Sequence, residues 1–441
     1  RVIDPSIGAD AVMDVAVAAG RVVAVAPKGE MPADFAPSKT IDATGLWVLP
    51  GLVDLSARLR EPGYEYRATL ESEMEAAMAG GVTSLVCPPD TEPVLDEPGL
   101  IEMLKFKARQ LNLAKVYPLG ALTTGLTGET LTEMAELTEA GCVGFSQAES
   151  PIRDLRVLLQ AMKYARNFGF TVFLRPTEPN FSKGGVAHAG AYASRMGLSG
   201  IPVMAETIAL QAYFELVRST GTRMHICRIS SAKGVELVRQ AKAEGLPVTC
   251  DVAIHHVHLT DLDIGFFDPN AHLIPPLREQ RDRDAIRAGL LDRTIDAICS
   301  DHTPVDDDAK LLPFAESEAG ATGLELLLTL TVKWMREQNV PPARIIELLC
   351  GNPANIIRVQ AGSLRTGMPA DLCLFNPEVD WVVGEASLIS QGKHTPFNGF
   401  PMQGKVQLTM VNGNVGYSSL EKSKMKVLAA KCSKQKQKKY N

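Results

Sequence analysis

Long apolar runs are absent from this chain of 441 residues. No stretch approaches the roughly 20 apolar residues that a membrane-spanning helix needs. The first residues, 1–5, also lack the charged-then-apolar pattern of an export signal. From these absences we expect a cytoplasmic protein that does not associate with a membrane.

Paired cysteines and phosphate-loop motifs are missing as well. None of the eight cysteines forms a C-x-x-C pair, and most lie among apolar residues, which favours reduced core thiols over a zinc site or disulfides. Gly184-Gly185 is not followed by the Gly-Lys-Ser/Thr of a phosphate-binding loop. No pattern suggests a serine or cysteine nucleophile with its triad.

An excess of basic charge is also lacking. The chain has 45 lysines and arginines against 51 acidic residues, a net charge of -6. Proteins that bind nucleic acids usually carry a basic surface. We therefore expect no nucleic-acid partner.

The middle of the chain, residues 49–359, alternates short apolar segments with helical patterns. The predicted strands are 51–55, 83–87, 115–119, 143–146, 171–174, 223–226, 247–252 and 296–300. Helical patterns between them include 69–79, 154–167, 205–218 and 234–243. Eight β-α pairs predict an α/β fold, a closed (β/α)₈ TIM barrel, with any chemistry at the carboxyl ends of its strands.

Both ends of the chain are rich in β-strand signals. Residues 15–25 alternate around the Ala19-Gly20 turn, and strand-like segments near the other end precede the Asn412-Gly413 turn. We expect residues 1–48 and 360–418 to form one small β-domain. The last segment, 419–441, holds eight lysines and is expected to be disordered or an artificial extension, with nucleic-acid binding as a minor alternative.

Several short motifs occur in one consistent order along the chain. They are 50–55 (PGLVDL), 59–63 (LREPG), 197–202 (GLSGIP), 300–304 (SDHTP), 351–354 (GNPA), 362–371, 392–397 (GKHTPF) and 404–406 (GKV). Each motif is weak alone, but together the chain resembles the dihydroorotases of the amidohydrolase superfamily. That resemblance implies an amidohydrolase-type barrel with a small β-sandwich domain built from both termini.

The resemblance also implies where metal ligands should stand. Working dihydroorotases of this type bind zinc through histidines and carboxylates at the strand ends. The matching positions here hold Ser56, Arg58, Gln147, Arg175, Arg228 and Asp301. Only Asp301 can ligate a metal in the expected way.

Arginine at three of these positions argues against a metal. A guanidinium group has no acceptor lone pair and does not lose its proton in proteins. At an effective dielectric of about 20, like charges ~4 Å apart repel by about 4 kcal/mol. We therefore expect no metal and no other cofactor at the strand ends, and the chain is predicted not to be an enzyme.

The positions that correspond to the family's substrate site have also changed. Arg60 matches the arginine that holds the substrate carboxylate in the family. Asp90, Ile274 and Val305 stand where two asparagines and a histidine are expected. Hydrogen-bonding groups have become apolar or acidic, which predicts weak binding of dihydroorotate.

The emptied barrel mouth still has to satisfy its charges. We expect Arg58, Arg175 and Arg228 to pair with Asp301 and with Glu178 in a network that replaces the metal. Converging arginines also suit a phosphate or carboxylate, so an anion pocket is the alternative. His255, His256 and His258 leave open a new metal site, since His256 and His258 would share one face of a strand.

The functional expectation follows from the resemblance. The chain is similar to inactive dihydroorotase-like chains that some bacteria use as structural partners of aspartate carbamoyltransferase in pyrimidine biosynthesis. That similarity implies a homodimer within a larger complex with the carbamoyltransferase catalytic chain. Two alternatives stay open: an active cyclic-amide hydrolase with an unusual metal site, and a metal-free scaffold unrelated to pyrimidine synthesis.

Overall fold

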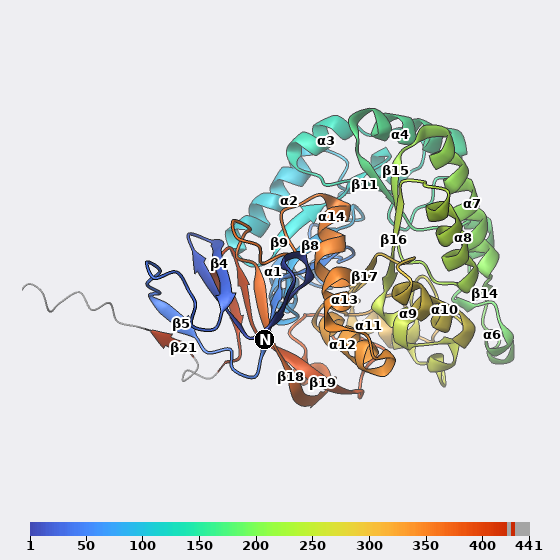
Figure 1. Cartoon of the computed structure of the whole chain (residues 1–441). Helices are drawn as coiled ribbons and strands as arrows, with labels where there is room; N and C mark the ends of the chain where they lie inside the picture. The colour runs from blue at the N-terminus through green and yellow to red at the C-terminus, as the bar shows by residue number, and fades with distance from the viewer. Residues whose placement is uncertain (421–424, 428–441) are drawn as a thin grey trace, which may run out of the picture.

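The computed structural model describes residues 1–420 and 425–427. Eight parallel strands form the ring at the centre of the fold (Figure 1). They are β7 (Leu52–Asp54), β8 (Val82–Cys87), β9 (Lys115–Pro118) with its continuation β10 (Gly120–Ala121), β11 (Phe145–Ser146), β12 (Thr171–Leu174), β15 (Arg223–Ile226), β16 (Val248–Ala253) and β17 (Ala297–Cys299). Every predicted strand is present, with each end within two residues of its predicted position.

The first and last strands of the ring meet just beyond their carboxyl ends. Ala57 and His302 form a parallel bridge, and the Arg58 amide donates to the His302 carbonyl at 2.8 Å. The ring is therefore a (β/α)₈ barrel, as the sequence predicted.

Helices follow the strands in turn and cover the outside of the ring (Figure 1). The main ones are α1 (Leu70–Ala79), α2 (Pro98–Leu111), α3 (Met134–Ala140), α4 (Leu155–Phe168), α7 (Val203–Thr220), α8 (Ala232–Ala243), α10 (Gln280–Leu291) and α12 (Leu327–Gln338). Local sequence sets where they begin: the side chains of Thr69, Asp154 and Ser231 each accept a hydrogen bond from a first-turn amide of α1, α4 and α8.

Short elements fill the connections at the barrel ends. They are η2 (Thr124–Leu126), α5 (Pro179–Ser182), β13 (Ala187–His188), α6 (Ala191–Met196), β14 (Gly200–Ile201), α9 (Ile254–His258), η3 (Asp261–Ile264), η4 (Pro269–Ala271), α11 (Asp307–Lys310), η5 (Leu324–Leu326), α13 (Pro342–Ile346), η6 (Glu347–Gly351) and α14 (Asn352–Ile357). Several of these connections lie beside the barrel mouth and carry residues of the site described below.

A second, β-rich unit combines both ends of the chain (Figure 1). One six-stranded sheet joins β1 (Val2–Asp4), β2 (Ala9–Ala11), β6 (Trp47–Pro50), β18 (Leu372–Val382), β19 (Pro401–Val411) and β20 (Asn414–Ser418), with η1 (Pro5–Ile7) and η7 (Glu385–Ser387) in its loops. The hairpin of β3 (Met13–Ala18) and β4 (Arg21–Pro27) turns at Ala19-Gly20, as predicted. Its Val15 and Val17 pack against the buried residues of this sheet, so a second β-layer covers it.

The segment predicted as a lysine-rich tail, 419–441, lies mostly outside the described residues. Within it, β21 (Met425–Val427) pairs antiparallel with β5 (Lys39–Ile41). No helix in residues 1–420 and 425–427 combines the length and the apolar character that crossing a bilayer requires.

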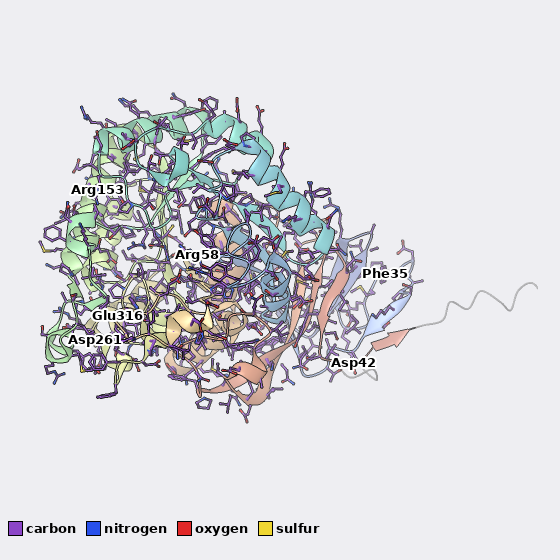
Figure 2. All side chains as sticks on the ribbon, turned by 180° about the vertical axis from the view of Figure 1, so that it is seen from behind. Phe35, Asp42, Arg58, Arg153, Asp261 and Glu316 are labelled. Atoms are coloured by element: carbon purple, nitrogen blue, oxygen red, sulfur yellow. The ribbon has the colours of Figure 1, made fainter. Side chains whose placement is uncertain are left out.

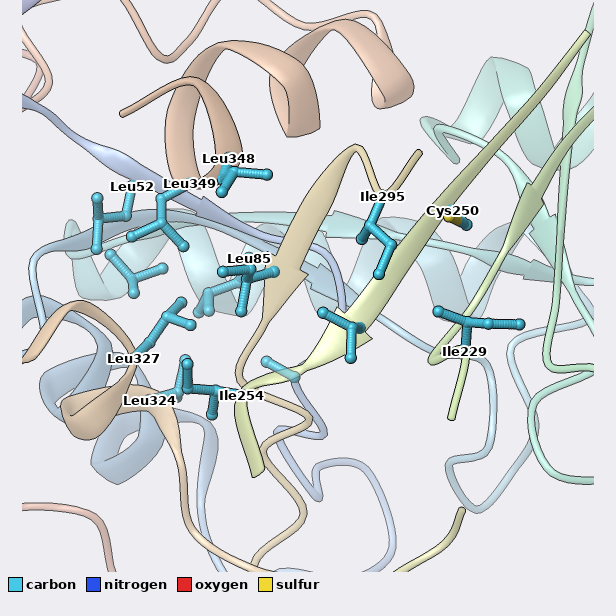
Figure 3. Packing of buried hydrophobic residues seen from close by; sticks show 14 of the residues in the cluster. Leu52, Leu85, Ile229, Cys250, Ile254, Ile295, Leu324, Leu327, Leu348 and Leu349 are labelled. Carbon is cyan, nitrogen blue, oxygen red and sulfur yellow. The ribbon is translucent and has the colours of Figure 1, made fainter. Parts of the chain in front are cut away.

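Leucines of the strands and of the surrounding helices meet in the largest core (Figure 3). Leu52 and Leu85 of the ring lie close to Leu348 and Leu349 of η6 and to Leu327 of α12, and all five are fully buried. Each such burial contributes about 1.5–3 kcal/mol. This packing fixes the ring and therefore the directions in which the strand ends point.

Candidate functional site

The strand ends bring together five of the predicted metal-site residues, of which Arg175 follows β12 and is half-buried; the other four lie deeper. Ser56 and Arg58 follow β7, Arg228 follows β15, and Asp301 follows β17. All four are buried. In Figure 2, Arg58 lies in the middle of the barrel, whereas the exposed Arg153 lies at its outer edge.

A carboxylate that the sequence analysis did not single out stands at the centre of this mouth. Glu149 Oε1 accepts from Arg58 Nη2 at 3.0 Å and from Arg228 Nη2. Its other oxygen, Oε2, accepts from Arg175 Nε at 2.5 Å. Glu149 therefore binds all three predicted arginines.

Further contacts extend the network to neighbouring strands. Arg228 Nη1 donates to Asp301 Oδ1 at 2.8 Å, and Ser56 Oγ donates to the same oxygen at 3.4 Å. Arg58 Nε donates to Asp90 Oδ2 at 2.8 Å. The ends of β7, β8, β11, β12, β15 and β17 are thus joined through ionic hydrogen bonds.

These charges shift one another's pKa values. Burial acts to raise the pKa of Glu149, but the charges of Arg175, Arg228 and Arg58 outweigh it and hold that pKa well below its usual range. Burial raises the pKa of Asp301, and Arg228 and Arg58 only partly offset this. Glu149 is therefore the carboxylate of the cluster that stays ionised, and Asp301 is the one that binds a proton more readily.

Backbone geometry marks the same strand ends. Arg60, Arg228 and Asp301 have φ values of 61°, 56° and 49°, in the left-handed region that side chains with a Cβ rarely adopt. Conformations of this kind gather at functional sites, where the surrounding structure holds them in place. Strained backbone thus accompanies the side-chain network at the barrel mouth.

Two residues expected in this cluster lie outside it. Gln147 is buried and exchanges hydrogen bonds with Thr123 at 2.8 and 3.1 Å. Glu178 was predicted to pair with the arginines, but it caps α5, where its carboxylate accepts from the Phe181 amide and the Asn180 side chain. The turn after β12 directs Glu178 to the local backbone, so Glu149 takes the role predicted for it.

The former substrate positions lie around the network. Arg60 is buried and donates to the Pro304 carbonyl at 2.8 Å, beside the buried Val305. Burial, with Arg58 and Arg67 nearby, lowers the pKa of Arg60 to about 10. The Ile274 carbonyl accepts weakly from Arg228 at 3.4 Å. Arg60 is thus a buried cation that an acidic ligand would stabilise.

The strand-end positions do not suit a divalent metal. Three guanidinium groups point into the space that ligands would have to share, and Asp301 is already bonded to Arg228. Since guanidinium donates only, no metal-dependent step is assigned to these positions.

The histidines after β16 also do not form the new metal site considered from the sequence. They lie on the helix α9 instead of a strand, and His256 and His258 bond separate carbonyls, those of Pro276 and Leu330. His255 stacks on Phe397 with ring centroids 5.6 Å apart. None of the three belongs to a group of potential metal ligands within the part of the chain that the structure describes.

Two other groups of side chains could hold a metal ion. In the first, ligand atoms of His225, Cys227 and Asp251 lie within 4.8 Å of one another. His225 Nε2 lies 2.9 Å from Asp251 Oδ2, and its Nδ1 lies 2.8 Å from Thr249 Oγ1, which orients the ring. Imidazole, thiolate and carboxylate are ligand types that zinc accepts.

The second group is less suited to a cation. It consists of His188, Glu279 and Asp282. Arg278 Nη1 lies 3.1 Å from His188 Nδ1, and burial together with that arginine lowers the pKa of His188. A cation placed there would face a guanidinium group at close range. The His225 group is therefore the better metal candidate.

Solved structures share this architecture. L-hydantoinase (dihydropyrimidinase) from Arthrobacter aurescens superposes with a TM-score of 0.85 at 26% identity, covering 97% of this chain and 96% of that one. Dihydropyrimidinase from Brevibacillus agri has the same fold, with a TM-score of 0.78 at 19% identity over 95% and 93% of the chains. The protein thus has the amidohydrolase fold, a TIM barrel with a β-rich domain.

Sequence relatives specify the family. Residues 45–234 match the dihydro-orotase-like family. A dihydroorotase-like protein of Pseudomonas aeruginosa is 44% identical over 94% of this chain and 97% of its own length. A dihydroorotase of Geotalea daltonii is 40% identical over 94% and 97%. The chain belongs to the dihydroorotase-like family.

The prediction that the chain is not an enzyme is therefore wrong. Its relatives and structural neighbours include proteins named dihydroorotase and hydantoinase, and its own side chains form groups that could hold a metal. The prediction weighed the strand-end positions and the histidines His255, His256 and His258. It overlooked His225, Cys227 and Asp251, which lie next to Arg228 in the same barrel.

We predict that Glu149→Gln lowers the free energy of unfolding by about 3 kcal/mol, because a neutral amide leaves three arginines without their shared counterion. The matched control, Glu178→Gln, changes a carboxylate that only caps α5 and should cost less than about 1 kcal/mol. Denaturant unfolding measures both, and equal costs would contradict the central role of Glu149.

A second prediction concerns pH. Burial lowers the pKa of His256 and of His258 to about 4 in the folded protein. As pH falls below about 6.5, these histidines are therefore protonated in the unfolded chain before they are protonated in the folded one. Stability that these neutral rings contribute is present above pH 6.5 and is lost as pH falls towards 4. Burial raises the pKa of Asp54 to about 6, which acts in the opposite direction.

The variant His256→Gln/His258→Gln isolates the histidine contribution. When the pH is lowered from 7 to 5, the free energy of unfolding of this variant should fall less than that of the wild type. The difference should exceed about 1 kcal/mol. Denaturant titrations at both pH values measure this difference. Parallel changes in the two proteins would show that these rings do not govern acid stability.

Proposed function

We propose that this chain is a metal-dependent hydrolase of a cyclic amide, with its metal held by His225, Cys227 and Asp251 instead of the strand-end positions. The observation that carries the proposal is the convergence of an imidazole, a thiol and a carboxylate, whose ligand atoms lie within 4.8 Å of one another. Three protein ligands with one open position are typical of catalytic zinc.

The placement of this group supports a role at the mouth. Asp251 Oδ1 accepts from the Arg228 amide at 2.5 Å, so the group lies directly beside the arginine network. A zinc ion bound there would supply a water molecule of lowered pKa. The pocket lined by Arg175 and Arg228 opens beside this network.

The family relationship and Arg60 support the substrate class. Relatives named dihydroorotase and a neighbour named L-hydantoinase suggest a cyclic amide. Arg60, at the position that the resemblance gives to substrate binding, is buried and bonds only a carbonyl among the described residues. A carboxylate on the substrate would neutralise it.

Asp301 is the residue of the mouth best suited to accept a proton during ring opening. Burial raises its pKa, and it lies on the strand end that faces the pocket arginines. A carboxyl with a raised pKa in a cleft is a good candidate for general acid–base work.

The test is metal analysis of the purified chain, combined with turnover assays on dihydroorotate and hydantoin. We expect about one zinc per chain, ring opening of at least one substrate, and loss of turnover after chelation. Cys227→Ser should weaken zinc binding at least about tenfold, because it removes a ligand. Cys142→Ser, at another buried cysteine, is the matched control. The absence of both metal and turnover in the wild-type protein would refute the proposal.

We also propose that the chain associates with the catalytic chain of aspartate carbamoyltransferase, as a homodimer within a larger complex. The ordered motifs that resemble chains with this partner are what supports it. Co-expression followed by size-exclusion chromatography should give one peak holding both chains. Separate elution at micromolar concentration would contradict the proposal.

A further inference from the structure

A small pocket opens beside the arginine network. It has a volume of about 200 Å³ and lies between the ends of β12 and β15 and the segment 274–278. Its charged lining residues are Arg175, Arg228, Arg278, Glu149 and Glu206. Three guanidinium groups and two carboxylates therefore face one confined space.

The arginines have more N–H donors than the described residues use. Within the described residues, Arg175 donates only through Nε, to Glu149. Arg278 donates through Nε to Ser230 and through Nη1 to the Ile201 carbonyl, which leaves Nη2 without a partner in the described part of the chain. Nε of Arg228, on a side chain only 6% exposed, is buried and has no partner among residues 1–420 and 425–427.

The carboxylates of the pocket are already occupied. The oxygens of Glu206 accept from the amides and hydroxyls of Ser230 and Ser231, at 2.5–3.1 Å. Glu149 is shared by three arginines. Both carboxylates of the lining are thus engaged, and a buried donor without a partner is destabilising.

We infer that this pocket binds a small oxyanion, a carboxylate or phosphate group, through the free donors of Arg175, Arg228 and Arg278. Guanidinium groups bind such oxygens with two parallel hydrogen bonds, and burial strengthens the contact. The volume is below the roughly 300–1,000 Å³ of pockets for drug-sized ligands, which favours a small molecule. The inference requires neither the metal nor hydrolysis.

Calorimetric titration of the chelator-treated full chain tests the inference, with inorganic phosphate and succinate as probes. We expect saturable binding of at least one probe at a single site. Arg175→Gln should weaken it about tenfold or more, because a charge-assisted contact is lost. Arg153→Gln removes an exposed arginine away from the pocket and should leave binding within twofold.

A second variant covers the case in which Arg175→Gln does not fold. Arg175→Lys keeps the charge but cannot form two parallel hydrogen bonds, so binding should weaken at least threefold. Tighter binding of succinate would assign a carboxylate ligand, and tighter binding of phosphate a phosphate ligand. Absence of saturable binding of both probes, or unchanged binding by the Arg175 variants, would overturn the inference. Because the titration is free of metal, its result is separate from that of the turnover assay.

Discussion

The shared ion pairing of Glu149 with Arg58, Arg175 and Arg228 is the interaction on which the barrel mouth depends. The three arginine side chains are 6–12% exposed, and buried cations require close acceptors. One carboxylate from the loop after β11 meets this requirement for groups that come from three different strands. It thereby links the ends of β7, β12 and β15.

This arrangement also governs what chemistry the site can perform. Guanidinium groups exclude a divalent metal from the strand ends, where the resemblance placed one. Donors suited to zinc are found instead at His225, Cys227 and Asp251, which touch the network through the Arg228 amide. The same arginines leave unused N–H groups on the pocket wall. The arginines at the strand ends thus influence both where a metal can bind and which ligands the pocket can hold.

The sequence pattern located most of the site but not its centre. The resemblance to dihydroorotases pointed to Ser56, Arg58, Arg228 and Asp301, and they are in contact. Glu149 was missed, although an acidic residue just beyond a strand end was a usable signal. The direction of the Glu149 side chain depends on Ala148, whose φ of 48° turns the chain. An alanine in the sequence does not predict such a conformation, which is typical of glycine.

The sequence by itself determined the barrel strands, the β-hairpin at Ala19-Gly20 and the presence of three arginines at the strand ends. These follow from apolar periodicity, turn residues and side-chain chemistry, which are local properties. Only the tertiary structure decided that Glu149 and not Glu178 pairs with the arginines, and that His225, Cys227 and Asp251 converge. Such choices depend on distances between residues far apart in the chain, and no local pattern encodes those distances.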